Sequence, residues 1–370
     1  MSTVRVSIPE EYPVIAPVIL SASRSTDIPA RHAKWFMERL REGWFGWVNP
    51  FNQKRYAVSL ENTRAIVFWT KHAAPLIPFL DEIEGRGFHF YFQYTLNDYE
   101  VEGLEPKIPA LDRRIETFLS LSQKIGPSRV IWRFDPIILH EGQSARDILH
   151  KIWNLSKRLR GATEKLVVSF ADVNVYRKVQ RNLVAEAPSL YSAENVALAE
   201  PTDAEIEEIA EGLRKIRNYW HDHGWDFTVA TCAEQIDLSR FGIERNSCVD
   251  GELLARHFPE DDALMTFLTK KKKVPAEASL FSELDQAIPI VSNRALKDKG
   301  QRKECGCVES KDIGMYNTCA NFCAYCYANA SRNVVKKNLL KIQAYDGHPP
   351  FLIPLDLEKT EITENTDQTT

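Results

Sequence analysis

The sequence predicts an α/β fold: a TIM-like (β/α) barrel or partial barrel of about six parallel strands, followed by a C-terminal cysteine-rich loop. Six short, almost uninterrupted apolar runs alternate with helical segments, as in a parallel sheet whose outer face is covered by helices. Polar residues stand at the end of every run. The C-terminal ends of barrel strands form the functional site in this type of fold, so these residues are expected to share one mouth.

The strands and helices follow one another in a regular order. The predicted strands cover residues 17–23, 65–72, 88–98, 129–138, 165–172 and 226–234. The first helix is predicted to begin near Asp27 or Ile28, with Pro29 in its first turn, and to stop at Gly43. Further helices are predicted at 111–126, roughly 143–160, and from a Thr202–Glu205 capping box to Gly224, and a last one within 328–345.

This order divides the chain into three parts. Residues 1–260 are predicted to form the barrel, and residues 261–355 a cysteine-rich segment that packs on the barrel mouth. Residues 356–370 are polar and are predicted to be a disordered tail.

Composition limits the class of protein. The chain has 370 residues, is 44% hydrophobic and carries a net charge of −4, so its surface as a whole does not indicate nucleic-acid binding. It has no 18-residue apolar run, and the opening "MSTVRVSIPEEYP" lacks an apolar core, so we expect a soluble cytoplasmic protein with no membrane contact. Seven cysteines, an odd number, indicate metal binding or redox chemistry rather than a secreted disulfide framework.

The polar strand ends supply the candidate site residues. The candidate catalytic residues are Arg24, Asp27, Lys71, Arg133 and Asp135, and the candidate cofactor-binding residues are Ser23, Gln93, Thr95, Ser169, Asp172 and Glu234. Burying a charged side chain in a barrel mouth costs free energy unless the charge is paired within the protein or takes part in binding or catalysis. Arg24 and Asp27 could bind the carboxylate and the amine of a ligand. Alternatively, they form an ion pair within the loop and Asp27 caps the helix. Arg133 and Asp135 face the same way on a strand, to bind substrate or to brace the barrel.

Three cysteines form a tight motif near the C-terminus. Cys319, Cys323 and Cys326 have C-x3-C-x2-C spacing within "CANFCAYCYAN", and Tyr325 directly precedes the last of them. Structural zinc takes four protein ligands, usually as two pairs. Three thiolates on one loop suit a [4Fe-4S] cluster better, because each binds one iron and the fourth iron stays open.

These stretches resemble known families. "CANFCAYC" resembles the cluster motif of the radical S-adenosylmethionine enzymes, and "YCYAN" is most similar to their spore photoproduct lyase-like branch. "SASRSTDIPA", "VFWTKH", "WRFDPI" and "GQRKECGCVESKDIGMYNTCANFCAYCYAN" resemble the domain of unknown function 1848 family over most of residues 17–330. This family is known for a C-terminal cysteine cluster like the N-terminal one of the radical enzymes.

The resemblance implies an activity. Cys319, Cys323 and Cys326 would hold a [4Fe-4S] cluster, S-adenosylmethionine would occupy the open iron, and a 5′-deoxyadenosyl radical would attack a substrate in the mouth. A flavodoxin or ferredoxin would supply electrons, and the substrate, a small molecule or a nucleic acid, is unknown. The motif follows all six strands, so the C-terminal loop is expected to return over the mouth; closing a long loop costs only about 0.6 kcal/mol per doubling of its length.

Four cysteines remain outside this motif: Cys232, Cys248, Cys305 and Cys307. Four thiolates complete a tetrahedral zinc site or a second iron–sulfur cluster. Alternatively, Cys232 and Cys248 are small buried apolar residues and only the C-x-C pair matters.

Two other classes of function stay open. One is a non-catalytic or electron-transfer iron–sulfur protein. The other is a metal-stapled nucleic-acid-binding or photolyase-like DNA repair protein, for which the basic run of Lys270–Lys273, Arg294, Lys297, Lys299, Arg302 and Lys303 would contact phosphates. A solvated surface loop, or positive charge that offsets an anionic thiolate cluster, is the favoured explanation of this run, because no aromatic residues interleave with it.

Overall fold

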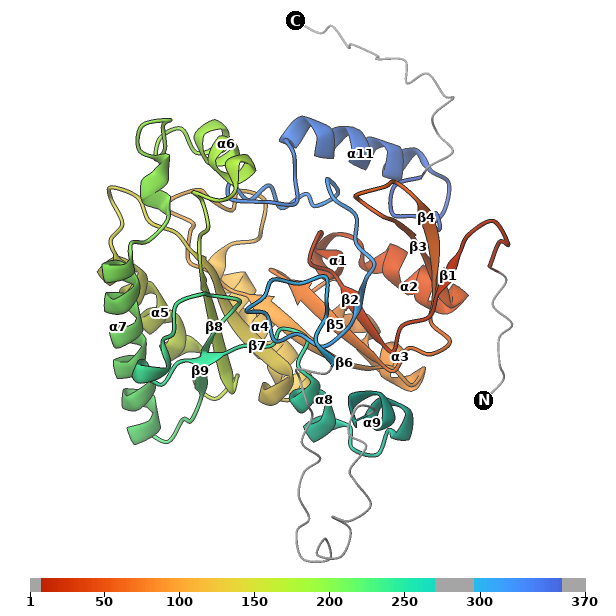
Figure 1. Cartoon of the computed structure of the whole chain (residues 1–370), viewed down its shortest axis with the longest axis horizontal. Coiled ribbons are helices and arrows are strands. Elements are labelled where there is room, and N and C mark those ends of the chain that lie inside the picture. The colour runs from red at the N-terminus through yellow and green to blue at the C-terminus, as the bar shows by residue number, and fades with distance from the viewer. Residues whose placement is uncertain (1–7, 270–295, 355–370) are drawn as a thin grey trace, which may run out of the picture.

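A computed structural model describes residues 8–269 and 296–354 of the chain (Figure 1). Its centre is an eight-stranded parallel sheet in the order β10-β9-β8-β7-β6-β5-β2-β11. The six predicted strands are confirmed as β2 (Ile19–Ala22), β5 (Ala65–Thr70), β6 (His89–Thr95), β7 (Val130–Ile137), β8 (Lys165–Phe170) and β9 (Thr228–Thr231). The edge strands β10 (Glu244–Arg245) and β11 (Lys311–Asp312) were not predicted, because two residues are too short to show a pattern.

The sheet is a partial barrel. Within the described ranges, the edge strands β10 and β11 are not paired with each other. One backbone hydrogen bond joins the segments beside them, from the Val308 N–H to the Val249 carbonyl (3.0 Å). We call the place where these two segments meet, between the edge strands β10 and β11, the seam.

The two faces of the strands enter different cores. One set of alternate strand residues, including Val67, Ile131 and Val167, packs with α8 (Gly251–His257) and α9 (Asp262–Thr269). The other set, including Phe68, Trp132 and Val168, packs against the covering helices. Period-two alternation therefore gives the sheet an inner and an outer apolar face, as the near-continuous apolar runs predicted.

The covering helices are α2 (Ala33–Glu42), α3 (Leu80–Gly85), α4 (Leu111–Ile125), α5 (Ala145–Leu159), α6 (Arg177–Glu186) and α7 (Asp203–Asp222). Four of them, α2, α4, α5 and α7, lie where helices were predicted, whereas α3 and α6 were not predicted. Thr202 and Glu205 make the predicted capping box, and Gly43 ends α2 with a left-handed φ of 83°. The first predicted helix is interrupted at His32, which separates α1 (Ile28–Arg31) from α2. The 3₁₀ turns are η1 (Ile77–Phe79), η2 (Pro127–Arg129), η3 (Val196–Ala199) and η4 (Ser239–Phe241).

A second, three-stranded sheet was not predicted. It consists of β1 (Val14–Ile15), β4 (Arg55–Ser59) and β3 (Trp44–Val48), in that order. The Phe351 ring packs directly on Gly46, where a Cβ would lie only 2.7 Å from it. This contact attaches the end of the described chain to the small sheet.

The chain returns across the sheet after residue 295. The strand β11 pairs with β2, and the segment that follows crosses the carboxyl ends of the strands before α11 (Arg332–Ala344), at the top of Figure 1. The segment that carries β11 and the last three cysteines therefore lies beside β2 and over the strand ends. The helix α9, within the segment predicted to cover the mouth, instead lies with α8 at the opposite end, where Asp261 bonds Arg64 (2.8 Å) and His89 (2.9 Å). The predicted tail, 356–370, lies outside the described residues.

No helix within residues 8–269 and 296–354 combines the length and apolar character needed to cross a membrane.

Candidate functional site

Asp27 lies at the centre of one side of the mouth. Its Oδ1 caps α1 through the Ala30 N–H (3.0 Å) and accepts the Thr70 hydroxyl (2.7 Å). Its Oδ2 accepts the Lys71 N–H (2.8 Å) and the Asn321 amide (3.0 Å). Burial raises the pKa of Asp27 although these bonds work to lower it. Four donors occupy the carboxylate, which favours the helix-cap interpretation over ligand binding.

The three motif cysteines lie on one loop over the carboxyl ends of the strands. Cys319, Cys323 and Cys326 are all half-buried. The Cys326 N–H bonds the Cys323 carbonyl (3.1 Å), and the Asn329 amide bonds the Cys319 carbonyl (2.9 Å). Burial raises the pKa of all three thiols, that of Cys319 to about 12. For Cys323 the Lys71 ammonium opposes this rise, whereas Glu105 and then the other two thiolates add to it.

A buried polar network holds this loop in the mouth. The Lys71 ammonium bonds Glu105 (2.8 Å) and the Tyr325 hydroxyl (3.0 Å), and Tyr325 donates to Glu105. Asn97 bonds the same hydroxyl (3.2 Å). Burial works to lower the pKa of Lys71, but Glu105 and then Cys323 outweigh it and the pKa is raised. Glu105 and Asn97 were missed from the sequence, whereas Tyr325 was noticed only for its spacing.

Arg133 and Asp135 face the same way, as predicted. Arg133 Nε donates to Asp135 Oδ2 (2.9 Å), and Arg133 Nη1 donates to Gln93 (3.1 Å). The Ser169 hydroxyl donates to the other oxygen of Asp135. These four predicted residues from β6, β7 and β8 therefore form one network, whose saturation favours the bracing interpretation.

Asp312, which was not predicted, ties β11 to the end of β2. Its carboxylate accepts the hydroxyls of Ser21 (2.8 Å) and Ser23 (2.7 Å) and the N–H groups of Arg24 (2.7 Å) and Gly314 (2.8 Å). Ser23 was predicted to bind a cofactor, but its hydroxyl donates a hydrogen bond to Asp312 instead.

Arg24 retains hydrogen-bonding capacity. Its guanidinium lies over the Trp69 ring, 4.9 Å from the centroid, and its buried Nη2 has no hydrogen-bond partner among the described residues. A buried donor without a partner is costly, so Arg24 is the strand-end residue best suited to an anionic ligand.

The remaining strand-end candidates are less connected. Thr95 is half-buried and makes no side-chain hydrogen bond to another described residue. Asp172 pairs with Arg302 (2.7 Å). Glu234 accepts the Phe170 N–H (3.0 Å), and burial raises its pKa to about 7. None of the three joins the cysteine loop directly.

The raised pKa of Glu234 predicts a pH-dependent stability difference. Below its ordinary value of 4.5 the residue is protonated in both the folded and the unfolded chain. As the pH rises from 4.5 to about 7 the unfolded chain ionises while the folded chain keeps its proton, so stability falls over this range and stays lower above it. Glu234→Gln, which can still accept the Phe170 N–H, is therefore expected to raise Tm at pH 8 and to leave it unchanged at pH 4. The exposed control Glu260→Gln should show no such difference; equal shifts at both pH values would contradict the assignment.

The other four cysteines also meet. Cys232 follows β9, Cys248 follows β10, and Cys305 and Cys307 precede β11. The sulfurs of Cys232 and Cys248 are 3.1 Å apart, and hydrogen bonds from Cys232 and Cys307 lower the pKa of Cys248. The neighbouring Cys307 thiol lowers the pKa of Cys305 to about 7. We call these four residues the cysteine quartet.

Neither cysteine group is arranged around a vacant ion position. Over residues 8–269 and 296–354, no cluster of three or more His, Cys, Asp or Glu has the geometry of a preformed metal site. In the quartet, the sulfurs of Cys232 and Cys248 touch each other instead.

The basic run gives little support to a nucleic-acid surface. Lys270–Lys273 and Arg294 lie outside the described residues. Lys297 bonds the Lys303 carbonyl, and Arg302 pairs with Asp172 and lies over the Tyr176 ring. Lys297 and Arg302 therefore make their contacts within the protein.

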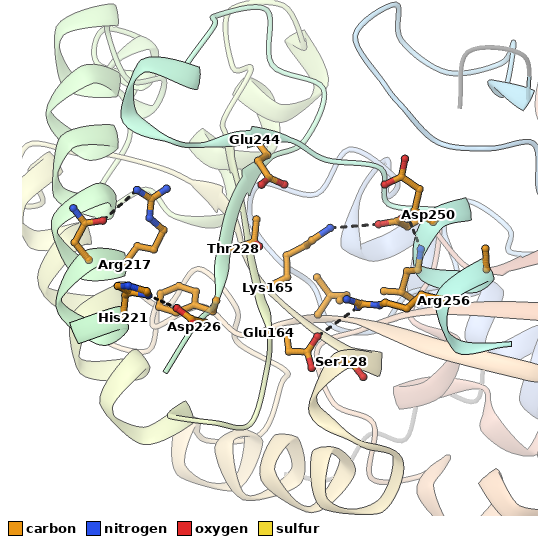
Figure 2. Close-up of a pocket in the computed structure, with 16 residues that line it drawn as sticks. Ser128, Glu164, Lys165, Arg217, His221, Asp226, Thr228, Glu244, Asp250 and Arg256 are labelled. Carbon is orange, nitrogen blue, oxygen red and sulfur yellow. Dashed lines mark hydrogen bonds and ion pairs between the residues drawn. The ribbon is translucent and has the colours of Figure 1, made fainter. Parts of the chain in front are cut away.

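The large cleft in Figure 2 lies at the other end of the strands from the cysteines. Its volume is about 1060 Å³, and it lies between the starts of β8 and β9, α7 and α8. Lys165 pairs with Asp250 (3.3 Å), and Arg256 pairs with Glu164 (3.4 Å). Its charges are therefore largely paired, and no cysteine lines it, so size alone does not make it the functional site.

Comparison with known proteins identifies a family for this chain. No curated protein and no solved structure matches the chain. A family model described as "Domain of unknown function (DUF1848)" matches residues 19–328, which include β2, the strand ends and both groups of cysteines. The chain therefore belongs to the DUF1848 family.

Proposed function

We propose that this protein is an iron–sulfur enzyme of the radical S-adenosylmethionine type. The observation that carries the proposal is the position of Cys319, Cys323 and Cys326: three thiols on one loop, held over the carboxyl ends of a parallel sheet. This is the end of the sheet at which α/β barrels place their active sites.

The residues around the loop fit a three-thiolate cluster. Asn321 is fixed by Asp27 (3.0 Å) and Tyr325 by Lys71 (3.0 Å), so residues within the loop are anchored on both sides of Cys323. Lys71 supplies a positive charge that lowers the pKa of Cys323 against the effect of burial. An ammonium beside thiolates offsets the negative charge of a cluster.

When bound, a reduced [4Fe-4S] cluster with S-adenosylmethionine on its open iron would supply a 5′-deoxyadenosyl radical. The chain's own residues would bind and orient the ligands. Arg24, with its free Nη2, is the candidate partner for a carboxylate. The Tyr325–Glu105–Lys71 network would hold the loop and exclude water beneath it.

Formation of 5′-deoxyadenosine tests this proposal without knowledge of the substrate. The full chain is purified and reconstituted with iron and sulfide anaerobically, reduced with dithionite, and given S-adenosylmethionine. We expect 5′-deoxyadenosine and methionine in equal amounts by chromatography. Replacement of Cys323 by Ala provides the matched control and should abolish the product.

A second readout separates the two iron–sulfur alternatives. If the open iron binds S-adenosylmethionine, its addition should change the electron paramagnetic resonance spectrum of the reduced cluster. A cluster that shows neither this change nor any product would identify a structural or electron-transfer protein. A protein that holds no cluster after reconstitution would overturn both iron–sulfur interpretations, the enzyme and the structural or electron-transfer protein.

A further inference from the structure

The cysteine quartet lies at the seam of the barrel. Cys248 and Cys307 directly precede Val249 and Val308, whose backbone hydrogen bond (3.0 Å) joins the two sides. Cys232 lies beyond the end of β9, next to Cys248. The four cysteines therefore lie at the end of β9, on the segment after β10 and on the segment before β11. This is the place where β10 and β11 are not paired with each other.

Donors converge on these sulfurs. Cys248 Sγ accepts from Arg133 Nη1 (3.1 Å) and Asn246 Nδ2 (3.3 Å), and Cys307 Sγ accepts from the Val249 N–H (3.3 Å). Arg133 is almost completely buried, at 4% exposure. Hydrogen bonds from N–H groups to sulfur stabilise the thiolate form, and such outer partners orient the ligands of metal sites.

The charges also suit a bound dication. Four thiolates and one divalent ion carry two net negative charges. The Arg133 guanidinium touches the Cys248 sulfur. The Arg133 guanidinium, which also pairs with Asp135, therefore contacts the quartet and offsets part of its charge.

We propose that Cys232, Cys248, Cys305 and Cys307 bind a single tetrahedral metal ion, zinc, which closes the seam. In a tetrahedral site with Zn–S bonds of about 2.3 Å, neighbouring sulfurs lie about 3.8 Å apart. The 3.1 Å between Cys232 and Cys248 is shorter than this, so these two sulfurs would move apart on binding, and Cys305 and Cys307 would complete the tetrahedron. A cubane puts each thiolate on a different iron and separates the sulfurs further. The proposal does not depend on a cluster at Cys319, Cys323 and Cys326.

Metal analysis of the full-length protein tests the assignment. We expect one zinc per chain, retained through dialysis against a weak chelator, and lost from Cys305→Ser/Cys307→Ser. Cys319→Ala/Cys323→Ala/Cys326→Ala should keep its zinc, and so should the neighbouring control Ser247→Ala.

Cobalt gives a readout that needs no variant to fold. Exchange of Co²⁺ into the wild-type protein should produce the intense visible bands of a tetrahedral ion with four thiolate ligands. Two results would overturn the proposal: a wild-type chain in which Cys232 and Cys248 are joined by a disulfide and no zinc is present, or iron and sulfide that disappear with Cys305 and Cys307.

Discussion

Replacement of Cys319, Cys323 and Cys326 by Ala is expected to remove the bound iron and sulfide completely, from about four of each per reconstituted chain to background. The broad brown absorbance should disappear with them. The reason is that no other thiol of the chain lies on this loop, and the quartet is proposed to hold a different metal. Iron, sulfide and the visible spectrum are measured on anaerobically reconstituted protein.

The matched comparison uses the other group of cysteines. Cys305→Ser/Cys307→Ser should keep its iron and sulfide. The triple Ala variant should remain folded by circular dichroism, because Asn321, Tyr325 and Asn329 still anchor the loop. A triple variant that stays brown would place the cluster elsewhere and refute the proposed function.

Much of the mouth could be predicted from the sequence because each strand carries its polar residue at the same end. Asp135, Arg133, Gln93 and Ser169 follow this rule and do meet. The rule cannot say which of these residues stay available for a ligand. Whether a group is available depends on how many of its hydrogen bonds are already made within the protein. The Asp27 carboxylate accepts four, whereas Arg24 Nη2 makes none to a described residue.

Residues that hold the C-terminal segment could not be predicted. Glu105 lies in a loop after β6, and its partner Tyr325 is 220 positions further along the chain. Neither local periodicity nor motif spacing contains that pairing. The same holds for β11, since two residues become a strand only through their partner β2. The sequence motif therefore identifies the cysteines, while the contacts that position them come from tertiary structure.

Asp312→Ala is expected to lower the free energy of unfolding by about 3 kcal/mol or more, an unusually large loss for a residue near a surface. Its carboxylate accepts five hydrogen bonds, from Ser21, Ser23, Ser25 and the N–H groups of Arg24 and Gly314. Hydrogen bonds to a charged acceptor each contribute about 1.5–3 kcal/mol, and donors left buried without a partner add a penalty.

The loss should extend to the metal sites, because Asp312 fixes to β2 the segment that carries Cys305 and Cys307 on one side and the Cys319–Cys326 loop on the other. Urea unfolding gives the stability, and iron retained after desalting gives the effect on the loop. Asp312→Asn, which keeps one acceptor oxygen but places an amide against donors, should fall between Ala and wild type. The exposed Asp237→Ala, which removes one bond to the Ser239 N–H, is the matched control. A loss below about 0.5 kcal/mol, the range of ordinary surface substitutions, would show that Asp312 does not hold the segment in place.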